Sequence, residues 1–533
     1  MTEKTDIYEK IMALAKRRGF IYPSYEIYGG ETGFYDYGPL GCLMKNNIEN
    51  EWRNFYVIKE GFYEISTPVI TPYAVLKASG HVDKFIDEIG YCKKCELSFK
   101  VEELKNGLCP ICGGNVERSE INLMFETGIG RKKERAFLRP ETAQGIFVNF
   151  PFLYEFSRKK IPFGIVQIGK GFRNEVSPRQ GMIRLREFSM AEAEIFFGEE
   201  NKKHAKLKEF ENEEIKVVYE GREEKIKLME GIGKIFGNEA IAYYLALTKK
   251  FLVKVGIHEN KIRFRKHEKN ELAHYANECW DAEVYSERFG WIECVGIADR
   301  QSYDLEAHMK ATGFDMNAIE TFDEPIKVRK KVVKLKMDKI GKLFREKAKI
   351  IKEKFDGAEF TGKLSIEIDG EIYEIGEEFY EIVEKEENVY LRKFLPHVIE
   401  PSYGIDRIFY FIMEHNYMEK EKEGEKYVIL SIPPNIAPIK AGVFPLLPKD
   451  GLPEIAKEIE SSLRRNKIIC FYDESGSIGR RYARMDEIGT PFCITVDYQT
   501  KEDDTVTIRF RDTSEQIRIK REDVAKWIEE RIR

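Results

Sequence analysis

The sequence predicts an α+β protein, in which a large domain of strands and helices is followed by a smaller C-terminal α/β domain. Three observations favour this fold class. Strand-like and helical runs alternate along most of the chain. A polar linker, MEKEKEGEKY, ends at Tyr427. The length of 533 residues allows three or four domains at roughly 150 residues each.

The N-terminal elements are read from apolar spacing. Residues 6–18 place isoleucine, leucine and alanine at helical intervals, and Gly19 closes the helix. Residues 22–42 are rich in Tyr and Gly, which indicates an aromatic loop and strand. A second helix is expected over 42–57, followed by a strand that ends near Pro68.

The middle of the chain alternates strands with short helices. Residues 163–176 and 187–197 are expected as two strands joined by a charged loop that contains Gly and Pro. Residues 198–265 are charged and partly helical, and residues 320–390 begin with a Lys-rich run. Because both stretches interrupt the strand pattern, we expect two inserted subdomains there.

The C-terminal region, 425–533, alternates strand-like and helical runs as an α/β domain does. It carries as many basic as acidic residues. Arg480, Arg481 and Arg484 fall on one predicted helix. A solvated helix face and a contact with an RNA backbone both fit these three residues.

Composition excludes several classes of protein. Hydrophobic residues make up 42% and charged residues 34%, and the net charge is −5, which neither requires nor excludes nucleic acid. The longest apolar stretches, such as 240–247, fall short of the roughly 18 residues of a membrane helix. The N-terminus shows no export signal. We therefore expect a soluble, cytoplasmic protein with no membrane partner.

Four of the nine cysteines predict a metal site within an insert at about 90–120. Cys92, Cys95, Cys109 and Cys112 form two Cys-x2-Cys knuckles separated by 13 residues. Two such knuckles supply the four thiolates of a closed, structural Zn²⁺ site. Unliganded reduced thiols or two disulfides are the alternatives, and the absence of an export signal disfavours the second.

Two further segments suggest nucleotide chemistry. Phe172-Arg173-Asn174-Glu175 ends one predicted strand, and Arg184 to Phe188 opens the next. Arg can clamp a phosphate and Phe can stack on a purine. A solvated strand edge explains either piece taken alone. Later, Glu400 to Arg407 runs into an apolar helix, which by itself indicates a helix start with a capping Asp.

Taken in order, these segments resemble a known family. Gly61-Phe62 to Pro68, the 172–188 segment and Gly404-Ile405-Asp406-Arg407 are similar to motifs 1, 2 and 3 of class II aminoacyl-tRNA synthetases. Segments 78–81, 139–145, 296–300 and 478–482 are similar to the homodimeric glycyl-tRNA synthetase family. The resemblance covers nearly the whole chain.

The resemblance implies both a fold and an assembly. The catalytic domain, 1–424, would be built on the class II antiparallel β-sheet with helices and inserts. Residues 425–533 would form an α/β anticodon-binding domain. The protein would be a homodimer, because motif 1 forms the class II dimer interface. Its partners would be glycine, ATP with Mg²⁺, and tRNA(Gly).

The resemblance also implies residue roles. Arg173 and Arg407 would be catalytic. ATP would contact residues of motifs 2 and 3 and one further pair: Arg173, Asn174, Glu175, Ile183, Arg184, Leu185, Arg186, Glu187, Phe188, Glu293, Cys294, Gly404, Ile405, Asp406 and Arg407. Glycine would contact Glu141, Phe188, Ser189, Met190, Ala191, Glu192, Arg300, Glu400, Pro401, Ser402, Tyr403 and Gly404. Lys100 stands where the family has a substrate-contacting Arg.

Two other interpretations remain open. A prolyl-, threonyl- or histidyl-tRNA synthetase would share the three motifs, but the pocket carboxylates and the Gly296 to Arg300 segment argue against it. A non-catalytic synthetase-like module that only binds nucleic acid would have no reason to retain both Arg173 and Arg407.

Overall fold

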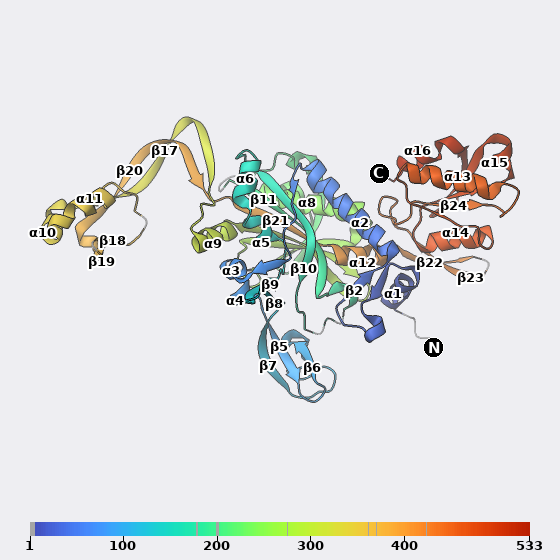
Figure 1. The fold of residues 1–533 in the computed structure, drawn as a ribbon, viewed down its shortest axis with the longest axis horizontal. Coiled ribbons are helices and arrows are strands. Elements are labelled where there is room, and N and C mark those ends of the chain that lie inside the picture. Colours follow the sequence, from blue (N-terminus) through green and yellow to red (C-terminus); the bar gives the residue numbers. More distant parts are fainter. Residues whose placement is uncertain are drawn as a thin grey trace. The chain divides into compact units, whose positions relative to one another are not determined.

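The computed structural model describes residues 6–532 except 177, 179, 199–201, 274, 361, 369 and 423. The chain divides into two compact units. Met1–Met316 together with Leu395–Arg533 form the first, and Asn317–Phe394 form the second. Figure 1 shows the elements of both units. Among the described residues, no helix has the length and apolarity that a membrane crossing requires.

A nine-stranded sheet forms the centre of the first unit. Neighbouring strands pair antiparallel, except that β12 with β14 and β10 with β3 are parallel. This architecture confirms the expected antiparallel-rich α+β fold. In spatial order the strands are β13 (Arg222–Lys227), β12 (Glu214–Tyr219), β14 (Ile262–Lys266), β15 (Glu278–Ser286), β16 (Gly290–Gln301), β21 (His397–Gly404), β11 (Glu187–Phe197), β10 (Phe163–Phe172) and β3 (Tyr63–Glu64).

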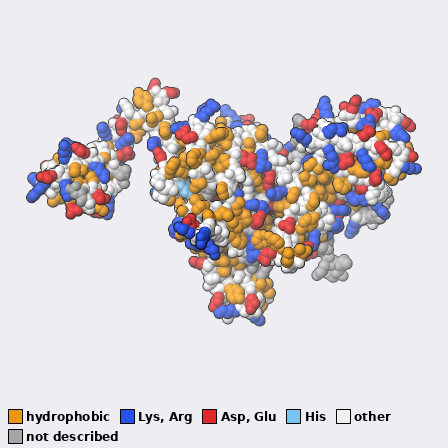
Figure 2. Space-filling model, in the orientation of Figure 1, with side chains coloured by type: hydrophobic (Ala, Val, Ile, Leu, Met, Phe, Trp, Pro, Cys, Tyr) orange, Lys and Arg blue, Asp and Glu red, His pale blue; other side chains and the backbone are white. Residues whose placement is uncertain are grey.

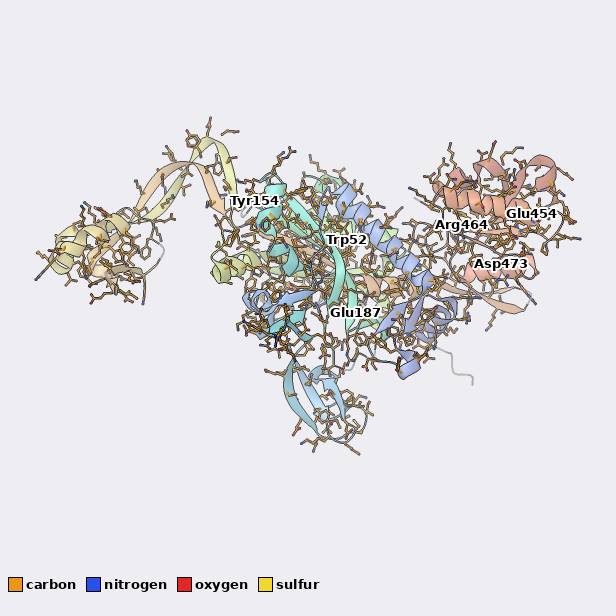
Figure 3. All side chains as sticks on the ribbon, in the orientation of Figure 1. Trp52, Tyr154, Glu187, Glu454, Arg464 and Asp473 are labelled. Atoms are coloured by element: carbon orange, nitrogen blue, oxygen red, sulfur yellow. The ribbon has the colours of Figure 1, made fainter. Side chains whose placement is uncertain are left out.

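Helices bury one face of this sheet. Helices α2 (Pro39–Arg53), α8 (Glu239–Lys254) and α12 (Ile405–His415) pack their apolar sides into one core with the odd-numbered residues of β11, such as Ala193 and Ile195. Trp52 on α2, labelled in Figure 3, is fully buried and stacks on Tyr56. Side chains alternate along a strand, so the even-numbered residues of β11 point to the opposite face.

The N-terminal elements agree with the sequence except at one strand. Helix α1 (Ile7–Arg18) ends at Gly19, whose φ of 75° is left-handed. The aromatic segment folds into β1 (Ile21–Pro23) and β2 (Tyr35–Tyr37). The strand expected up to Pro68 is ordered as β3 only over two residues, with one further backbone hydrogen bond from Ile65 N to Val166 O. Pro68 lacks the N–H that a longer ladder needs.

The segment 198–265 is not the inserted subdomain that we expected. It supplies β12, β13 and β14 at one edge of the main sheet, and it supplies α8 to the core. Its edge strand, β13, consists almost entirely of charged residues, and their side chains are mostly exposed. Edge strands commonly carry charge, which explains why the composition resembled an insertion.

The second unit, 317–394, is an independent hairpin with a small folded end; the range expected for this insert was about 320–390. Strands β17 (Ala318–Leu335) and β20 (Tyr380–Phe394) pair antiparallel. Helices α10 (Met337–Phe344) and α11 (Ala348–Phe355) and strands β18 (Leu364–Ile368) and β19 (Glu371–Ile375) share its core. Its surface mixes basic and acidic side chains (Figure 2), with cross-strand ion pairs such as Lys334 to Glu381.

The smaller sheets of the first unit include those of the cysteine segment and of the C-terminal region. The cysteine segment forms β5 (Ile86–Cys92), β6 (Leu97–Lys100) and β7 (Val116–Asn122). The C-terminal region forms a five-stranded sheet in the order β25 (Cys470–Tyr472), β24 (Ala441–Pro445), β26 (Phe492–Val496), β27 (Thr505–Phe510) and β28 (Gln516–Lys520). Its helices are α13 (Leu452–Arg465), α14 (Ile478–Glu487), α15 (Tyr498–Asp503) and α16 (Val524–Glu529).

Candidate functional site

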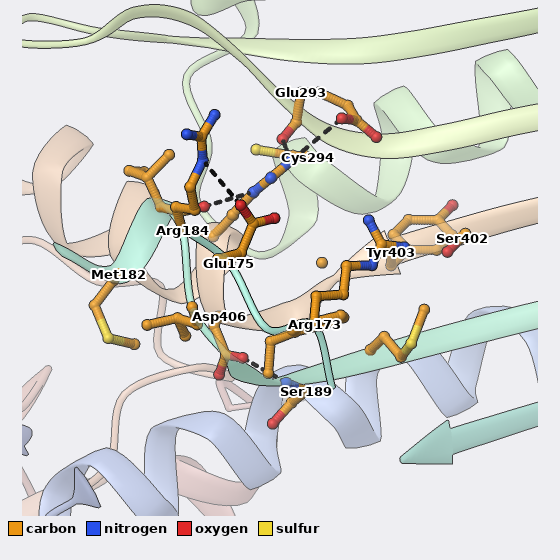
Figure 4. A pocket seen from close by; sticks show the side chains of 16 residues that line it. Arg173, Glu175, Met182, Arg184, Ser189, Glu293, Cys294, Ser402, Tyr403 and Asp406 are labelled. Carbon is orange, nitrogen blue, oxygen red and sulfur yellow. Dashed lines mark hydrogen bonds and ion pairs between the residues drawn. The ribbon is translucent and has the colours of Figure 1, made fainter. Parts of the chain in front are cut away.

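A cavity lies where β10 ends, β11 begins and β21 runs into α12. Side chains and backbone from all these elements converge on it (Figure 4). Its lining comprises Arg173, Glu175, Met182, Ile183, Arg184, Leu185, Phe188, Ser189, Met190, Glu293, Cys294, Ser402, Tyr403, Gly404, Asp406 and Arg407. The structure thus gathers most of the predicted ATP residues, although they come from segments more than 200 positions apart.

Local packing fixes the cations of this cavity. Arg407 donates from Nε to Ile183 O at 3.0 Å and from Nη1 to Glu293 O at 2.6 Å. The Arg173 guanidinium carbon lies 5.4 Å from the centroid of the Phe188 ring. Opposite Phe188 on β10 is Gly171, where a Cβ would come within 2.7 Å of that ring, so glycine is needed for the ring to lie there. Two arginines and one aromatic ring therefore border the same space.

Four predicted ATP residues do not line the cavity: Asn174, Arg186, Glu187 and Ile405. Arg186 instead binds the N-terminal segment, donating to Glu31 Oε1 at 2.7 Å and Thr32 O at 3.1 Å. Ile405 is fully buried in the core. Glu187 pairs with Lys170 at 3.4 Å.

Asp406 has a structural partner set although it lines the cavity. It accepts hydrogen bonds from the Tyr37 hydroxyl and from Ser189 N. Burial raises the pKa of this carboxyl, and these donors oppose that rise. Asp406 therefore ties the start of α12 to β11, which positions the neighbouring Arg407.

A second cluster of buried charges lies beside the cavity. Arg300 Nη1 is 3.0 Å from both carboxylate oxygens of Glu400, and Arg300 Nη2 is 3.8 Å from Glu141 Oε1. Glu192 accepts from Thr142 N at 2.7 Å and from Ser402 Oγ at 2.8 Å. Ser402 also lines the cavity, so it joins the two parts of the site.

The three glutamates of this cluster have perturbed acidities. Burial raises the pKa of Glu400 to about 8, against the opposing effect of Arg300. Burial and the charge of Glu141 raise the pKa of Glu192. Burial would also raise the pKa of Glu141, but His81 and Arg300 outweigh it and leave that pKa lowered. The cluster therefore holds more acidic groups than its cations neutralise, and it favours a further positive charge.

Some of the residues that were predicted to bind glycine do not point their side chains toward the acidic cluster. Ala191, Pro401 and Tyr403 occupy the strand positions that face the opposite side of the sheet. The Tyr403 hydroxyl is 2.8 Å from the Tyr56 hydroxyl and 2.7 Å from Thr248 Oγ1, deep in the core. These three residues can reach a ligand in the pocket only through their backbone.

Sequence reasoning missed several members of the cluster. His81 Nε2 is 3.4 Å from Glu141, and Gln144 Nε2 donates to Glu141 at 3.1 Å and to Asp304 at 2.8 Å. Asp304 also accepts two bonds of 2.8 Å from Arg300, and Tyr275 lies under the Arg300 guanidinium at 3.7 Å. His81 and Gln144 belong to the family-like segments 78–81 and 139–145, which was the available signal.

The four clustered cysteines meet as the spacing predicted. Their sulfur atoms all lie within 4.8 Å of one another, with Cys92 Sγ 3.4 Å from Cys112 Sγ. A Cβ at Gly114 would meet the sulfurs of Cys92 and Cys112 at 3.3 Å, so this glycine lets the chain close around them. A four-thiolate set of this size fits a Zn²⁺ ion.

Lys100 lies on β6 of the cysteine segment, close to the cavity that Arg173 and Arg407 line. Its Nζ is 2.6 Å from Asp87 Oδ2 and 3.6 Å from Glu175 Oε2. It therefore stands beside a cavity-lining carboxylate rather than in the Arg300 cluster.

The basic helix of the C-terminal region does not present all three of its arginines to solvent. Arg481 is buried. Its guanidinium donates to the backbone carbonyl of Pro445 and, at 3.1 Å, to that of Gly476. Arg484 pairs with Asp473. Only Arg480 of the three is exposed. Arg481 thus holds the domain together and is not on a solvated helix face.

Comparison with solved structures supports the fold. A Giardia lamblia prolyl-tRNA synthetase in complex with prolyl-adenylate is similar with a TM-score of 0.55 and 13% identity, covering 97% of this chain and 76% of that one. Residues 436–531 match the family model described as an anticodon binding domain. The fold is therefore that of the class II aminoacyl-tRNA synthetases, whose three motifs the sequence resembles.

Sequence relatives narrow the family. The glycine–tRNA ligase of Methanocaldococcus jannaschii is 49% identical over 99% of both chains. Those of Pyrococcus horikoshii and Methanococcus maripaludis are 46% and 45% identical over at least 99% of both chains. The chain belongs to the glycine–tRNA ligase family, which confirms the resemblance read from the motifs.

Proposed function

We propose that the protein activates glycine with ATP and transfers it to the 3′ end of tRNA(Gly). In the first step a glycine carboxylate oxygen attacks the α-phosphorus, the bond to the β-phosphate breaks, and pyrophosphate leaves. In the second step the terminal ribose hydroxyl attacks the glycyl carbonyl, loses its proton, and AMP leaves. The observation that carries this proposal is the junction at Ser402 of the Arg-lined cavity and the acidic cluster.

The cavity is proposed to bind ATP. Arg173 would hold the α-phosphate, where charge develops during attack, and Phe188 and Arg407 would sandwich the adenine. Positioning and charge neutralisation suffice for this chemistry, so no side-chain nucleophile is required. Of the four residues outside the lining, Asn174 can contribute from the strand end, whereas Arg186 is already held by Glu31.

The acidic cluster is proposed to bind glycine. Glu141, Glu192 and Glu400 would surround its ammonium with acceptors, because charge-assisted hydrogen bonds are the strong ones. Ser402, fixed by its bond to Glu192, would lie against the glycine Cα and leave no room for a methyl group. Arg300 would hold Glu400 and Glu141 in place.

Two metal ions are proposed. Glu175 and Glu293 are the cavity-lining carboxylates that could hold Mg²⁺ beside the phosphates, and Glu175 Oε2 is buried without a hydrogen-bond partner among the described residues. Bound Mg²⁺ would neutralise phosphate charge. Zn²⁺ at Cys92, Cys95, Cys109 and Cys112 would be structural, since four thiolates leave no open position.

A homodimer is also proposed. Beside motif 1, Tyr63 is 39% exposed and its ring lies 5.0 Å from that of Phe156, which is 67% exposed. Phe152 on the same helix, α6 (Phe150–Phe156), is 72% exposed. Clustered exposed aromatics of this kind are typical of an interface between chains.

The function is tested by pyrophosphate exchange with each of the twenty amino acids, followed by charging of tRNA(Gly). Exchange that depends on glycine and charging that depends on tRNA(Gly) are expected. Exchange with proline, threonine or histidine in place of glycine would contradict the proposal, and the absence of any exchange would favour a non-catalytic module.

A further inference from the structure

Glu194 is a buried acid that no step of the proposed reaction uses. It lies on β11, two residues after Glu192 and on the same face of the sheet. Its side chain is fully buried. Neither of its carboxyl oxygens has a hydrogen-bond partner among the described residues, in contrast to Glu141, Glu192 and Glu400, each of which accepts from at least one donor.

The groups that face Glu194 come from every neighbouring element. On β21, the pairs Glu192 with Ser402 and Ile195 with Ile399 place Glu194 opposite Glu400. Arg300 on β16 and Asp304 on α9 (Tyr303–Thr312) are the other nearby charges besides Glu192. On β10, Glu194 pairs with Ile165, and the adjacent polar residue on that face, Gln167, is uncharged.

An ionised Glu194 would be a buried charge without a partner. Arg300, the one cation among these neighbours, already makes two bonds each to Asp304 and Glu400. Like charges directly opposite on neighbouring strands destabilise a sheet, and an isolated buried charge costs more than almost any other defect. Burial and the charge of Glu400 accordingly raise the pKa of Glu194 well above its ordinary value.

We propose that Glu194 is a neutral carboxylic acid that positions the carboxylates of Glu400 and Glu192, which are proposed to bind glycine. In this form it has one O–H donor, and the acceptors that face it are Glu400 and Glu192. The proton would orient these carboxylates toward the ammonium of glycine without adding a charge to an already acidic cluster. This inference rests on the proposed function of the same pocket.

Two substitutions of similar side-chain length distinguish the three possible roles of Glu194: a neutral hydrogen-bond donor, a negative charge, or a side chain that only fills space. Glu194→Gln keeps a neutral donor, and Glu194→Met keeps the volume without one. We expect the glycine KM of Glu194→Gln to stay within about threefold of wild type. We expect Glu194→Met to raise the glycine KM about tenfold or more while the ATP KM stays within about threefold, as the loss of a hydrogen bond to a charged group predicts.

Glu192→Gln is the matched control on the same strand, and it should raise the glycine KM because it removes a carboxylate proposed to contact glycine. If Glu194→Gln weakens glycine binding as much as this control does, Glu194 is charged and the inference is wrong. An unchanged glycine KM in Glu194→Met also overturns it, because the acid would then only fill space.

A pH profile covers the case in which Glu194→Met does not fold. Because a neutral Glu194 does not titrate, the glycine KM of Glu194→Gln should follow wild type from pH 6 to about 9. Loss of a titration step in Glu194→Gln would refute the inference. Wild-type protein without glycine-dependent exchange would refute the proposed function and this inference together, whereas either contrary variant result in active protein refutes the inference alone.

Discussion

Glu400→Gln is the substitution that tests the glycine pocket most directly. It removes the carboxylate charge while it retains the shape of the side chain and an oxygen that can accept from Arg300 Nη1, now 3.0 Å from both carboxylate oxygens. Because burial raises the pKa of Glu400 to about 8, a neutral side chain costs little in the empty pocket. The fold should therefore tolerate glutamine, and the loss should appear in glycine binding.

The size of that loss follows from the chemistry of the contact. A hydrogen bond to a charged group contributes about 1.5–3 kcal/mol, which corresponds to roughly 10- to 150-fold in the glycine KM. Only the ionised form of Glu400 provides it. The pKa is raised, so the proton must leave as glycine binds, and each pH unit below about 8 weakens wild-type binding by up to tenfold.

The difference between wild type and Glu400→Gln should consequently grow as the pH rises from 7 to about 8.5. Pyrophosphate exchange, measured across this range with glycine and with ATP varied in turn, gives both KM values. The ATP KM should change by less than about threefold. Glu126→Gln, which removes an exposed carboxylate on β8 (Glu126–Ile129), is the control. A glycine KM that is unchanged, or a difference that does not depend on pH, would refute this account of the pocket.

Three further predictions concern other parts of the chain. Arg173→Ala should lower the rate of exchange by about 10²–10³ without unfolding the protein, because it removes a donor to the developing charge; a rate within about threefold of wild type would exclude this role. Protein prepared under reducing, metal-replete conditions should contain one Zn²⁺ per chain by elemental analysis, and Cys109→Ser should lose it; metal-free wild type would contradict the four-cysteine site. Arg480→Glu, the exposed member of the basic helix, should raise the tRNA KM severalfold and leave exchange unchanged, whereas equal charging by both proteins would place the RNA contact elsewhere.

The fold could be predicted where the sequence carries a local signal. The helix that ends at Gly19 follows directly from periodicity and turn residues, and so do four of the five strands of the C-terminal sheet. The fifth, β24, gives no strand signal in the sequence pattern. The segment 198–265 could not be placed, because charge on an edge strand and charge on an insertion look the same in composition. What distinguishes them is the pairing of Val217 with Phe264, a contact across 47 positions that no local pattern encodes.

The site was predictable to a similar degree. Motif residues such as Arg173, Phe188 and Arg407 do converge on one cavity. The basic helix shows the limit of this reasoning, because Arg481 satisfies backbone carbonyls inside the domain and only its neighbours reach solvent. Helical spacing predicts which side of the helix a side chain lies on, but it does not predict whether other parts of the domain bury that side.

The acidic cluster explains how a pocket can select a ligand that has no side chain. Five buried acids, Glu141, Glu192, Glu194, Glu400 and Asp304, surround one buried arginine, Arg300. Such a cluster is stable while empty only if some of its acids are protonated, because unpaired buried charges are costly. The ammonium of glycine supplies the missing positive charge, and binding is then limited by how rigidly the acceptors are held. Ser402 connects the rigidity of the acceptors to the size of the amino acid that fits. It donates to Glu192, which would also bind the ammonium. Moving Ser402 to admit a methyl group would therefore weaken the contact that every amino acid needs, so recognition of the ammonium and exclusion of larger side chains depend on one hydrogen bond.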